Sequence, residues 1–227
     1  MSDYNQRLRN VREHDACGIG AVVHIDGKAD NKVVDQALTI VEKLEHRAGK
    51  DASGEVGDGV GILLQISHRF FKKAVQSLPI NLPQPHHYAV GMFFFPQDTQ
   101  QQAMKTFENM TKKNQLKFLG WRKVPCQEDI LGQKAKECMP CIMQCFIEKN
   151  NNQKKMDFER ILYLVRREFE KTCSRSYVVS LSSSTIVYKG MFLVQQLRQF
   201  YLDLQDSDYQ SAIAVSYTHL RYCGFGY

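Results

Sequence analysis

The 227-residue sequence lacks any run of about 18 consecutive apolar residues, so it predicts no membrane-spanning helix. Its first sixteen residues, MSDYNQRLRNVREHDA, lack the apolar stretch of a secretory signal, and they are short and acidic for an organelle transit peptide. The chain also lacks internal repeats and low-complexity linkers. We therefore expect a cytoplasmic globular protein, with a plastid as the alternative compartment, that forms one domain or one domain and part of another.

A concentration of positive charge is missing as well. The net charge of +6 comes from 30 Lys and Arg against 24 Asp and Glu, and the basic residues are scattered, with only short pairs such as Lys72–Lys73 and Arg166–Arg167. Nucleic-acid-binding domains usually carry a basic stripe or a recognisable module. The sequence shows neither, so we expect a solvated surface and neither nucleic acid nor a membrane as a partner.

The seven cysteines give little support for a disulfide framework. Their number is odd and no secretory signal precedes them, which favours a reducing compartment. They lie at positions 17, 126, 138, 141, 145, 173 and 223. The spacing within CMPCIMQC (138–145) is similar to that of zinc or iron–sulfur ligands, but no fourth ligand lies nearby. Because Cys141 and Cys145 share one face of an expected strand, we interpret them as core residues and predict no metal site.

Apolar periodicity predicts helices alternating with strands. One face of a helix over 31–46 would carry Val33, Val34, Ala37, Leu38, Val41 and Leu44. Further helices are expected over 98–112, with Asp98 as N-cap, and over 157–171 and 193–202. Strands are expected over 18–25, 62–66, 88–95, 118–124, 141–148, 177–181, 185–189 and 211–215. Short turns between several strands favour antiparallel pairing and an α+β fold.

The segment HDACGIG (14–20) places a cysteine at the head of an expected strand. A thiol with a pKa of about 8.5 is only a few per cent ionised at neutral pH and needs a base to act as a nucleophile. If Cys17 were the first residue of the chain, its own α-amine, with a pKa of about 7.7–8.0, would be that base. Taken alone, an ordinary buried cysteine at a strand start is the commoner explanation of this segment.

The segment EHRAGKDASGEVGDGVGI (45–62) combines a His–Arg pair with five glycines. Glycines at this density let the backbone approach a ligand or adopt a positive φ. Arg47 could fix a carboxylate or hold a chain terminus through charge-assisted hydrogen bonds. The segment lacks the Lys-Ser/Thr of a phosphate-binding P-loop, and it follows a helix rather than the strand of a dinucleotide-binding motif. On this segment alone, a flexible surface turn is as well supported as a site.

Together, the two segments resemble the class II glutamine amidotransferases, and most closely those of the glutamate synthase large subunit. The similar stretches are DACGIG (15–20), LEHRAG (44–49), GDGVGILLQISHRFF (57–71), VGMFFFPQD (90–98), LGWRKVP (119–125), LYLVRREFE (162–170), SLSSSTIVYKGM (180–191) and DLQDSDYQSAIAV (203–215). The resemblance covers roughly residues 10–215. It implies a four-layer αββα sandwich of the N-terminal-nucleophile hydrolase type.

The resemblance also implies roles for individual residues. Residues 1–16 would be a propeptide, and cleavage after Ala16 would expose Cys17 as the nucleophile. Cys17 would attack the side-chain amide of glutamine, release ammonia and leave a γ-glutamyl thioester that water hydrolyses to glutamate. Arg47 matches the arginine that supports the nucleophile's terminus. Asp58 and Gly59 match the glycine-rich loop near the site.

The sequence departs from the family pattern at two places. Ala48 stands where the family usually has glycine. After residue 215 the family continues with a segment that carries a substrate-binding arginine, and later with an Asn-Gly oxyanion hole. Here the sequence is SYTHLRYCGFGY, in which His219 and Arg221 have the right spacing but lie three positions late. We therefore expect residues 17–215 to be the N-terminal part of the amidotransferase domain and 216–227 to be an atypical tail, with weak or no activity in this fragment alone.

The resemblance places the cofactors outside this fragment. In the full-length family enzyme, ammonia reaches a flavin-containing synthase domain of the same polypeptide, where 2-oxoglutarate becomes glutamate with the help of FMN and an iron–sulfur cluster. Glutamine and that synthase domain are thus the expected partners, and no cofactor is expected here. Two alternatives stay open: another class II amidotransferase, feeding phosphoribosylamine, glucosamine or asparagine synthesis, and a catalytically inactive domain that only binds or regulates.

Overall fold

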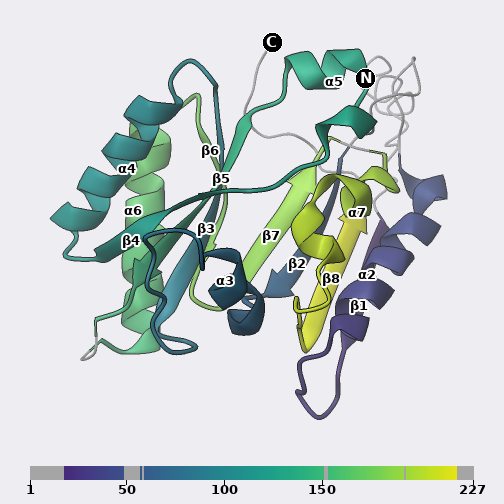
Figure 1. The fold of residues 1–227 in the computed structure, drawn as a ribbon, viewed down its shortest axis with the longest axis horizontal. Helices are drawn as coiled ribbons and strands as arrows, with labels where there is room; N and C mark the ends of the chain where they lie inside the picture. The colour runs from purple at the N-terminus through teal and green to yellow at the C-terminus, as the bar shows by residue number, and fades with distance from the viewer. Residues whose placement is uncertain (1–17, 49–56, 58, 151–152, 192, 219–227) are drawn as a thin grey trace, which may run out of the picture.

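The computed structural model describes residues 18–48, 57, 59–150, 153–191 and 193–218. These residues form two antiparallel four-stranded sheets (Figure 1). The first sheet has, in spatial order, β1 (Gly18–Val23), β8 (Ile213–Thr218), β2 (Val60–Gln65) and β7 (Thr185–Gly190). The second has β4 (Lys117–Lys123), β5 (Cys141–Glu148), β3 (Tyr88–Phe95) and β6 (Tyr177–Ser182). A short turn joins β6 to β7 and thus connects the two sheets.

Helices cover both sheets. Figure 1 shows α4 (Gln100–Lys113) and α6 (Lys155–Thr172) together on one side of the molecule, over the second sheet, and α2 (Asn31–Lys43) on the other side, along β1 and β8. The remaining helical segments are short. They are η1 (Glu45–Arg47), α3 (His68–Ala74), η2 (Glu128–Ile130), α5 (Gln133–Glu137), α7 (Gln196–Phe200) and η3 (Leu202–Gln205). The two sheets and their helices confirm the predicted α+β sandwich.

The strand β3 shows how the second sheet serves two cores. Its side chains alternate between faces, as the period of a strand requires. Tyr88, Val90 and Met92 join the larger core, which also includes the buried face of α2. Phe93 and Phe95 join a second core beneath α4 and α6. Both faces of this sheet are therefore covered.

A buried polar cluster joins the two sheets through η3. The guanidinium of Arg122 in β4 forms two hydrogen bonds of 2.8 Å with the carboxylate of Asp203. Their side chains are 8% and 1% exposed. Tyr188 in β7 donates its hydroxyl to Asp203 at 2.9 Å, and Gln144 in β5 accepts from Arg122 at 2.7 Å. Each charged group thus has bonded partners, as a buried ion pair requires.

Several sequence predictions need correction. Asp98 does not cap α4: the N-cap is Thr99, and the Asp98 carboxylate accepts a 2.8 Å hydrogen bond from Arg175 instead. The helix expected over 193–202 is only the five residues of α7, followed by η3. The helices α3 and α5 were not predicted. Among the described helices, none has the length and apolar character needed to cross a bilayer.

Candidate active site

The segments singled out in the sequence meet at one end of the first sheet. The pairing register defines a row of four residues across this end: Gly18, Thr218, Val60 and Gly190. Gly18 directly follows Cys17 in the sequence, and Val60 directly follows Gly59. The starts of β1 and β2 therefore lie on either side of the last residue of β8, although about 40 residues separate them along the chain.

The first strand is held at its start by a side chain of β8. The backbone N–H of Gly18 donates a buried 3.0 Å hydrogen bond to Oγ1 of Thr218. The side chain of Leu44 also packs against Gly18, since a Cβ at this position would lie 3.1 Å from its Cδ1. Leu44 is the C-cap of α2, and η1 begins at the next residue. The turn η1 is thereby brought to the same end of the sheet as the starts of β1 and β2.

The η1 turn is short and is held by a side chain from another segment of the chain. The N–H of Ala48 donates to the carbonyl of Glu45 at 3.0 Å, which closes the turn. The side-chain amide of Gln195 donates to the Glu45 carboxylate at 2.7 Å. The backbone of Arg47 ends η1. The Arg47 side chain, Cys17 and Asp58 lie outside the described residues, and their predicted roles stay predictions.

The glycine-rich segment enters β2 through a backbone conformation that favours glycine. Gly59 is buried and has φ = 111°, a value that residues with a Cβ rarely adopt. Two residues later, a Cβ on Gly61 would lie 2.7 Å from the ring of Tyr217 in β8. Gly59 is thus favoured by its backbone conformation, and Gly61 by the close approach of the Tyr217 side chain.

A family model described as class-II glutamine amidotransferases matches residues 17–224. The chain belongs to this family. Its match begins at Cys17, the predicted nucleophile, and includes β1, η1 and the start of β2.

Relatives of this amidotransferase domain are much longer proteins. The large chain of NADPH glutamate synthase from Bacillus subtilis is 39% identical over 217 residues, which cover 92% of this chain and 14% of the relative. The Azospirillum brasilense protein with the same description is 37% identical over 92% of this chain and 14% of its own length. Ferredoxin-dependent glutamate synthase 1 of Arabidopsis thaliana is 38% identical over 93% of this chain and 13% of its own length.

Burial makes several of the other described cysteines poor nucleophiles. It raises the pKa of their thiols and so lowers the fraction of thiolate. Burial raises the pKa of the Cys126 thiol to about 12. It also raises the pKa values of Cys141, Cys145 and Cys173. Cys145 is a buried member of the core beneath α4 and α6, which confirms it as a core residue, and the half-buried Cys141 packs against that core. Within the described ranges, no group of three or more His, Cys, Asp or Glu could hold a metal ion.

Two contacts at the candidate site could not be predicted from the sequence. The Gly18–Thr218 hydrogen bond spans 200 residues, and the Gln195–Glu45 bond spans 150. No local spacing indicates such pairs. Lys189 was also missed: it lies opposite Gly61 in the register, with its Nζ 4.4 Å from the centre of the Tyr177 ring. The YKG stretch in which it stands was noted only for its similarity to the family.

Proposed function

We propose that this domain hydrolyses glutamine to glutamate and ammonia, with Cys17 as its N-terminal nucleophile. The observation that carries the proposal is the meeting of the start of β1, the start of β2 and η1 at one end of the first sheet. These segments adjoin or contain Cys17, Gly59 and Arg47. Membership of the amidotransferase family, with a match that begins at residue 17, supports it.

The reaction requires the release of residues 1–16. Cleavage after Ala16 gives Cys17 a free α-amine, whose ordinary pKa of about 7.7–8.0 is close to that of a thiol. The amine accepts the thiol proton while the sulfur attacks the side-chain amide carbon of glutamine. The C–N bond then breaks, ammonia leaves with that proton, and a γ-glutamyl thioester remains. Water, deprotonated by the same amine, hydrolyses the thioester, so that glutamate leaves and the thiol is restored.

The neighbouring residues have supporting roles in this proposal. Arg47 holds the freed terminus or a substrate carboxylate through charge-assisted hydrogen bonds, and a cation near the thiol favours the thiolate. Asp58 and Gly59 form the loop beside the nucleophile. The positive φ of Gly59 supports a loop that brings backbone groups close to a substrate.

We further propose that the domain works within a longer polypeptide. Relatives named glutamate synthase contain a region similar to this chain as 13–15% of their length. In such a protein, the ammonia would convert 2-oxoglutarate to glutamate in a flavin-containing synthase domain. In this proposal residues 17–215 belong to the amidotransferase domain; the tail predicted over 216–227 begins too early, because residues 216–218 complete β8 and pair with β1 and β2.

The residues described here do not fit the cofactors of such a synthase. An iron–sulfur cluster needs several cysteine ligands close together, and no such group is present among the described residues, where Cys145 is buried in the core and Cys126 and Cys141 are half-buried. We therefore assign FMN and the iron–sulfur cluster to the synthase region of the longer proteins. No step of the glutaminase reaction involves them.

Glutamate release from glutamine tests the proposed function. A Cys17→Ser variant should lose activity about 10²-fold or more if Cys17 is the nucleophile, because the hydroxyl is much less acidic than the thiol. N-terminal sequencing should start at Cys17 in the wild-type protein. A domain that only binds or regulates would keep residues 1–16 and show the same background glutamate release with either residue.

A further inference from the structure

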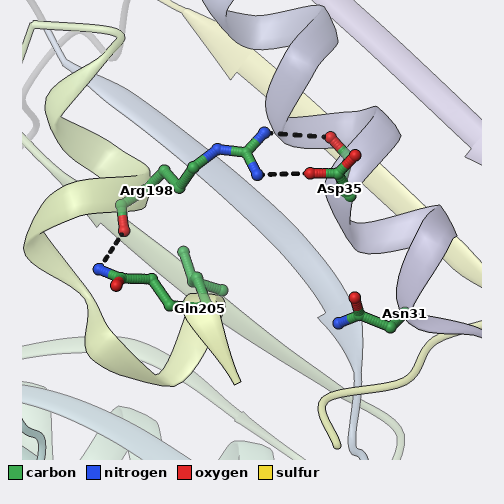
Figure 2. Close-up of a pocket in the computed structure, with 5 residues that line it drawn as sticks. Asn31, Asp35, Arg198 and Gln205 are labelled. Carbon is green, nitrogen blue, oxygen red and sulfur yellow. Dashed lines mark hydrogen bonds and ion pairs between the residues drawn. The ribbon is translucent and has the colours of Figure 1, made fainter. Parts of the chain in front are cut away.

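The segment from Gln195 to Arg198 connects β7 with α2 and η1, at the end of the first sheet where the candidate site lies. It follows β7, whose last residue, Gly190, pairs with Val60 at the start of β2. At its other end it contacts α2 and η1. Figure 2 shows Arg198 of α7 reaching across a surface pocket to Asp35 of α2, with dashed lines marking their contacts.

Arg198 is bonded to α2 through its whole guanidinium group. Its Nη1 lies 2.5 Å from Oδ1 of Asp35, and its Nε lies 2.9 Å from Oε1 of Glu42. Its Nη2 also donates to the Asp35 carbonyl at 3.3 Å and to the Thr39 hydroxyl at 3.4 Å. These acceptors span two turns of the helix, so the planar donor group fixes both the distance and the rotation of α2 relative to α7.

Gln195, three residues before Arg198, contacts η1, the element that follows α2. Its amide donates to the Glu45 carboxylate at 2.7 Å, at the first residue of η1. The bond lies two residues from Arg47, at the end of a three-residue turn. Because so short a turn has little internal hydrogen bonding, an outside contact has a large share in its position.

The segment from Gln195 to Arg198 is itself held by hydrogen bonds from residues that follow it in the chain. The side-chain amide of Gln205 donates to the carbonyls of Arg198 and Gln199 at 3.0 and 3.1 Å, and the first of these bonds is visible in Figure 2. The Tyr201 hydroxyl donates to the Lys189 carbonyl at 2.8 Å. The segment is therefore fixed to β7 and is bonded to α2 and η1.

We propose that Gln195 and Arg198 are positioning residues that set the place of η1, and through it of Arg47, relative to the start of β2. The inference rests on the proposed function for the role of Arg47, but the contact itself can be tested separately. The bonds are partly exposed, so their loss leaves the fold intact and moves the turn. A displacement of about 1 Å in a reacting group can lower a rate by about 10²-fold.

Hydrogen exchange tests the contact without any need for activity. In Gln195→Ala, the amide of Ala48, which closes η1, should exchange about three- to tenfold faster than in the wild-type protein. Gln97→Ala is the matched control, because Gln97 likewise donates one side-chain hydrogen bond, to the Met139 carbonyl and not to η1. Unchanged exchange at Ala48 in Gln195→Ala would overturn the inference.

Labelling of Cys17 by diazo-oxo-norleucine, a glutamine-analogue electrophile, tests the effect on the site. Gln195→Ala should raise the concentration for half-maximal labelling rate about three- to tenfold, and the maximal rate should change less. The double variant Glu45→Gln/Gln195→Glu re-forms the hydrogen bond with donor and acceptor exchanged, and it should restore wild-type labelling. Arg198→Ala should weaken labelling in the same way, whereas Arg175→Ala, which removes an exposed ion pair with Asp98, should not.

The two measurements separate the inference from the proposed function. A wild-type chain without a label on Cys17 would count against the proposed function, while the exchange of Ala48 would still decide whether Gln195 holds η1. Normal labelling in Gln195→Ala, or a double variant that labels no better than the single one, would overturn the positioning role even if the proposed function holds.

Discussion

The two sheets of this domain differ in what covers them. The second sheet packs against α4 and α6 through an aromatic cluster in which the Phe107 ring lies 4.7 Å from Phe93, 5.4 Å from Phe169 and 5.7 Å from Trp121. The first sheet begins with the sequence GIGAVV, in which Ile19 is 73% and Val23 58% exposed. Both sheets contribute to apolar burial, since Val60, Ile62 and Leu64 of β2 are completely buried, but the edge strand β1 of the first sheet is partly exposed and the candidate site lies at its start.

The aromatic cluster that stabilises the fold and the candidate site therefore lie in different parts of the molecule. Large buried side chains contribute most of the favourable burial energy, whereas a site needs backbone and polar groups that a ligand can reach. The Arg122–Asp203 cluster lies between these regions and connects them through β4, β5 and β7. Changes in the second sheet should therefore affect unfolding, and changes at the end of the first sheet should affect labelling of Cys17.

The largest effect on stability is expected from Phe107→Ala. Phe107 is completely buried, and Phe→Ala in a core typically costs about 3–5 kcal/mol. Denaturant unfolding would measure the loss. Labelling of Cys17 under conditions where the variant stays folded should match the wild-type protein. A cost below about 1 kcal/mol would contradict the view that this core stabilises the domain.

Asp203→Asn should have the next largest effect. The substitution leaves the buried guanidinium of Arg122 without its counter-charge, and breaking a buried ion pair costs about 3 kcal/mol or more. The double variant Arg122→Met/Asp203→Leu should recover part of that loss, because both charges are removed together. If the double variant were less stable than Asp203→Asn in urea unfolding, the ion pair itself would be the stabilising element.

Gly61→Ala should affect the site more than the fold. The added methyl group meets the Tyr217 ring at 2.7 Å, and such overpacking costs about 1–3 kcal/mol. Because Gly61 lies two residues beyond Gly59, the shift should also slow labelling of Cys17. Ala21→Gly, in exposed β1, offers a control with a change of similar size. Equal labelling of Gly61→Ala and wild type would show that this part of β2 does not influence the site.

Arg175→Ala should have the smallest effect. Its hydrogen bonds hold the pKa of the exposed Asp98 carboxylate below its usual value. A lowered folded-state pKa adds stability above the unfolded-state pKa of about 3.9, and this contribution disappears as the pH falls through the folded-state pKa. The pair is exposed, so the variant and the wild type should differ little near pH 7, and this small difference should disappear as the pH falls through the folded-state pKa. A clear difference at pH 7 would show that exposed ion pairs matter more here than expected.

Much of the fold could be predicted from the sequence, because many of its patterns are local. The helical spacing of Val33, Val34 and Val41 predicted the buried face of α2, and the alternation in 141–148 predicted the placement of Cys145. The helix α3 was missed, because its seven residues are fewer than the window of about 11–18 residues in which apolar spacing identifies a helix. Asp98 was predicted as a cap because aspartate favours that position, whereas Arg175 binds its carboxylate.

The site could be predicted only in part for the same reason. Residues 17–20 and 45–62 indicated chemistry, but neither segment could show that it lies beside the other. Their proximity depends on β8, which separates β1 from β2 and comes from the far end of the sequence. Contacts such as that of Gln195 with Glu45 likewise follow from the packing of α7 against α2.

The intact mass of the purified protein, before and after incubation with diazo-oxo-norleucine, tests the central claim most directly. Our account predicts a chain that begins at Cys17 and gains one adduct, which peptide mapping places on Cys17 and which Cys17→Ala abolishes. Covalent labelling needs a single reaction event, so it detects the nucleophile even where turnover is slow. A chain that keeps residues 1–16 and gains no adduct, or that gains it on another cysteine, would contradict the account.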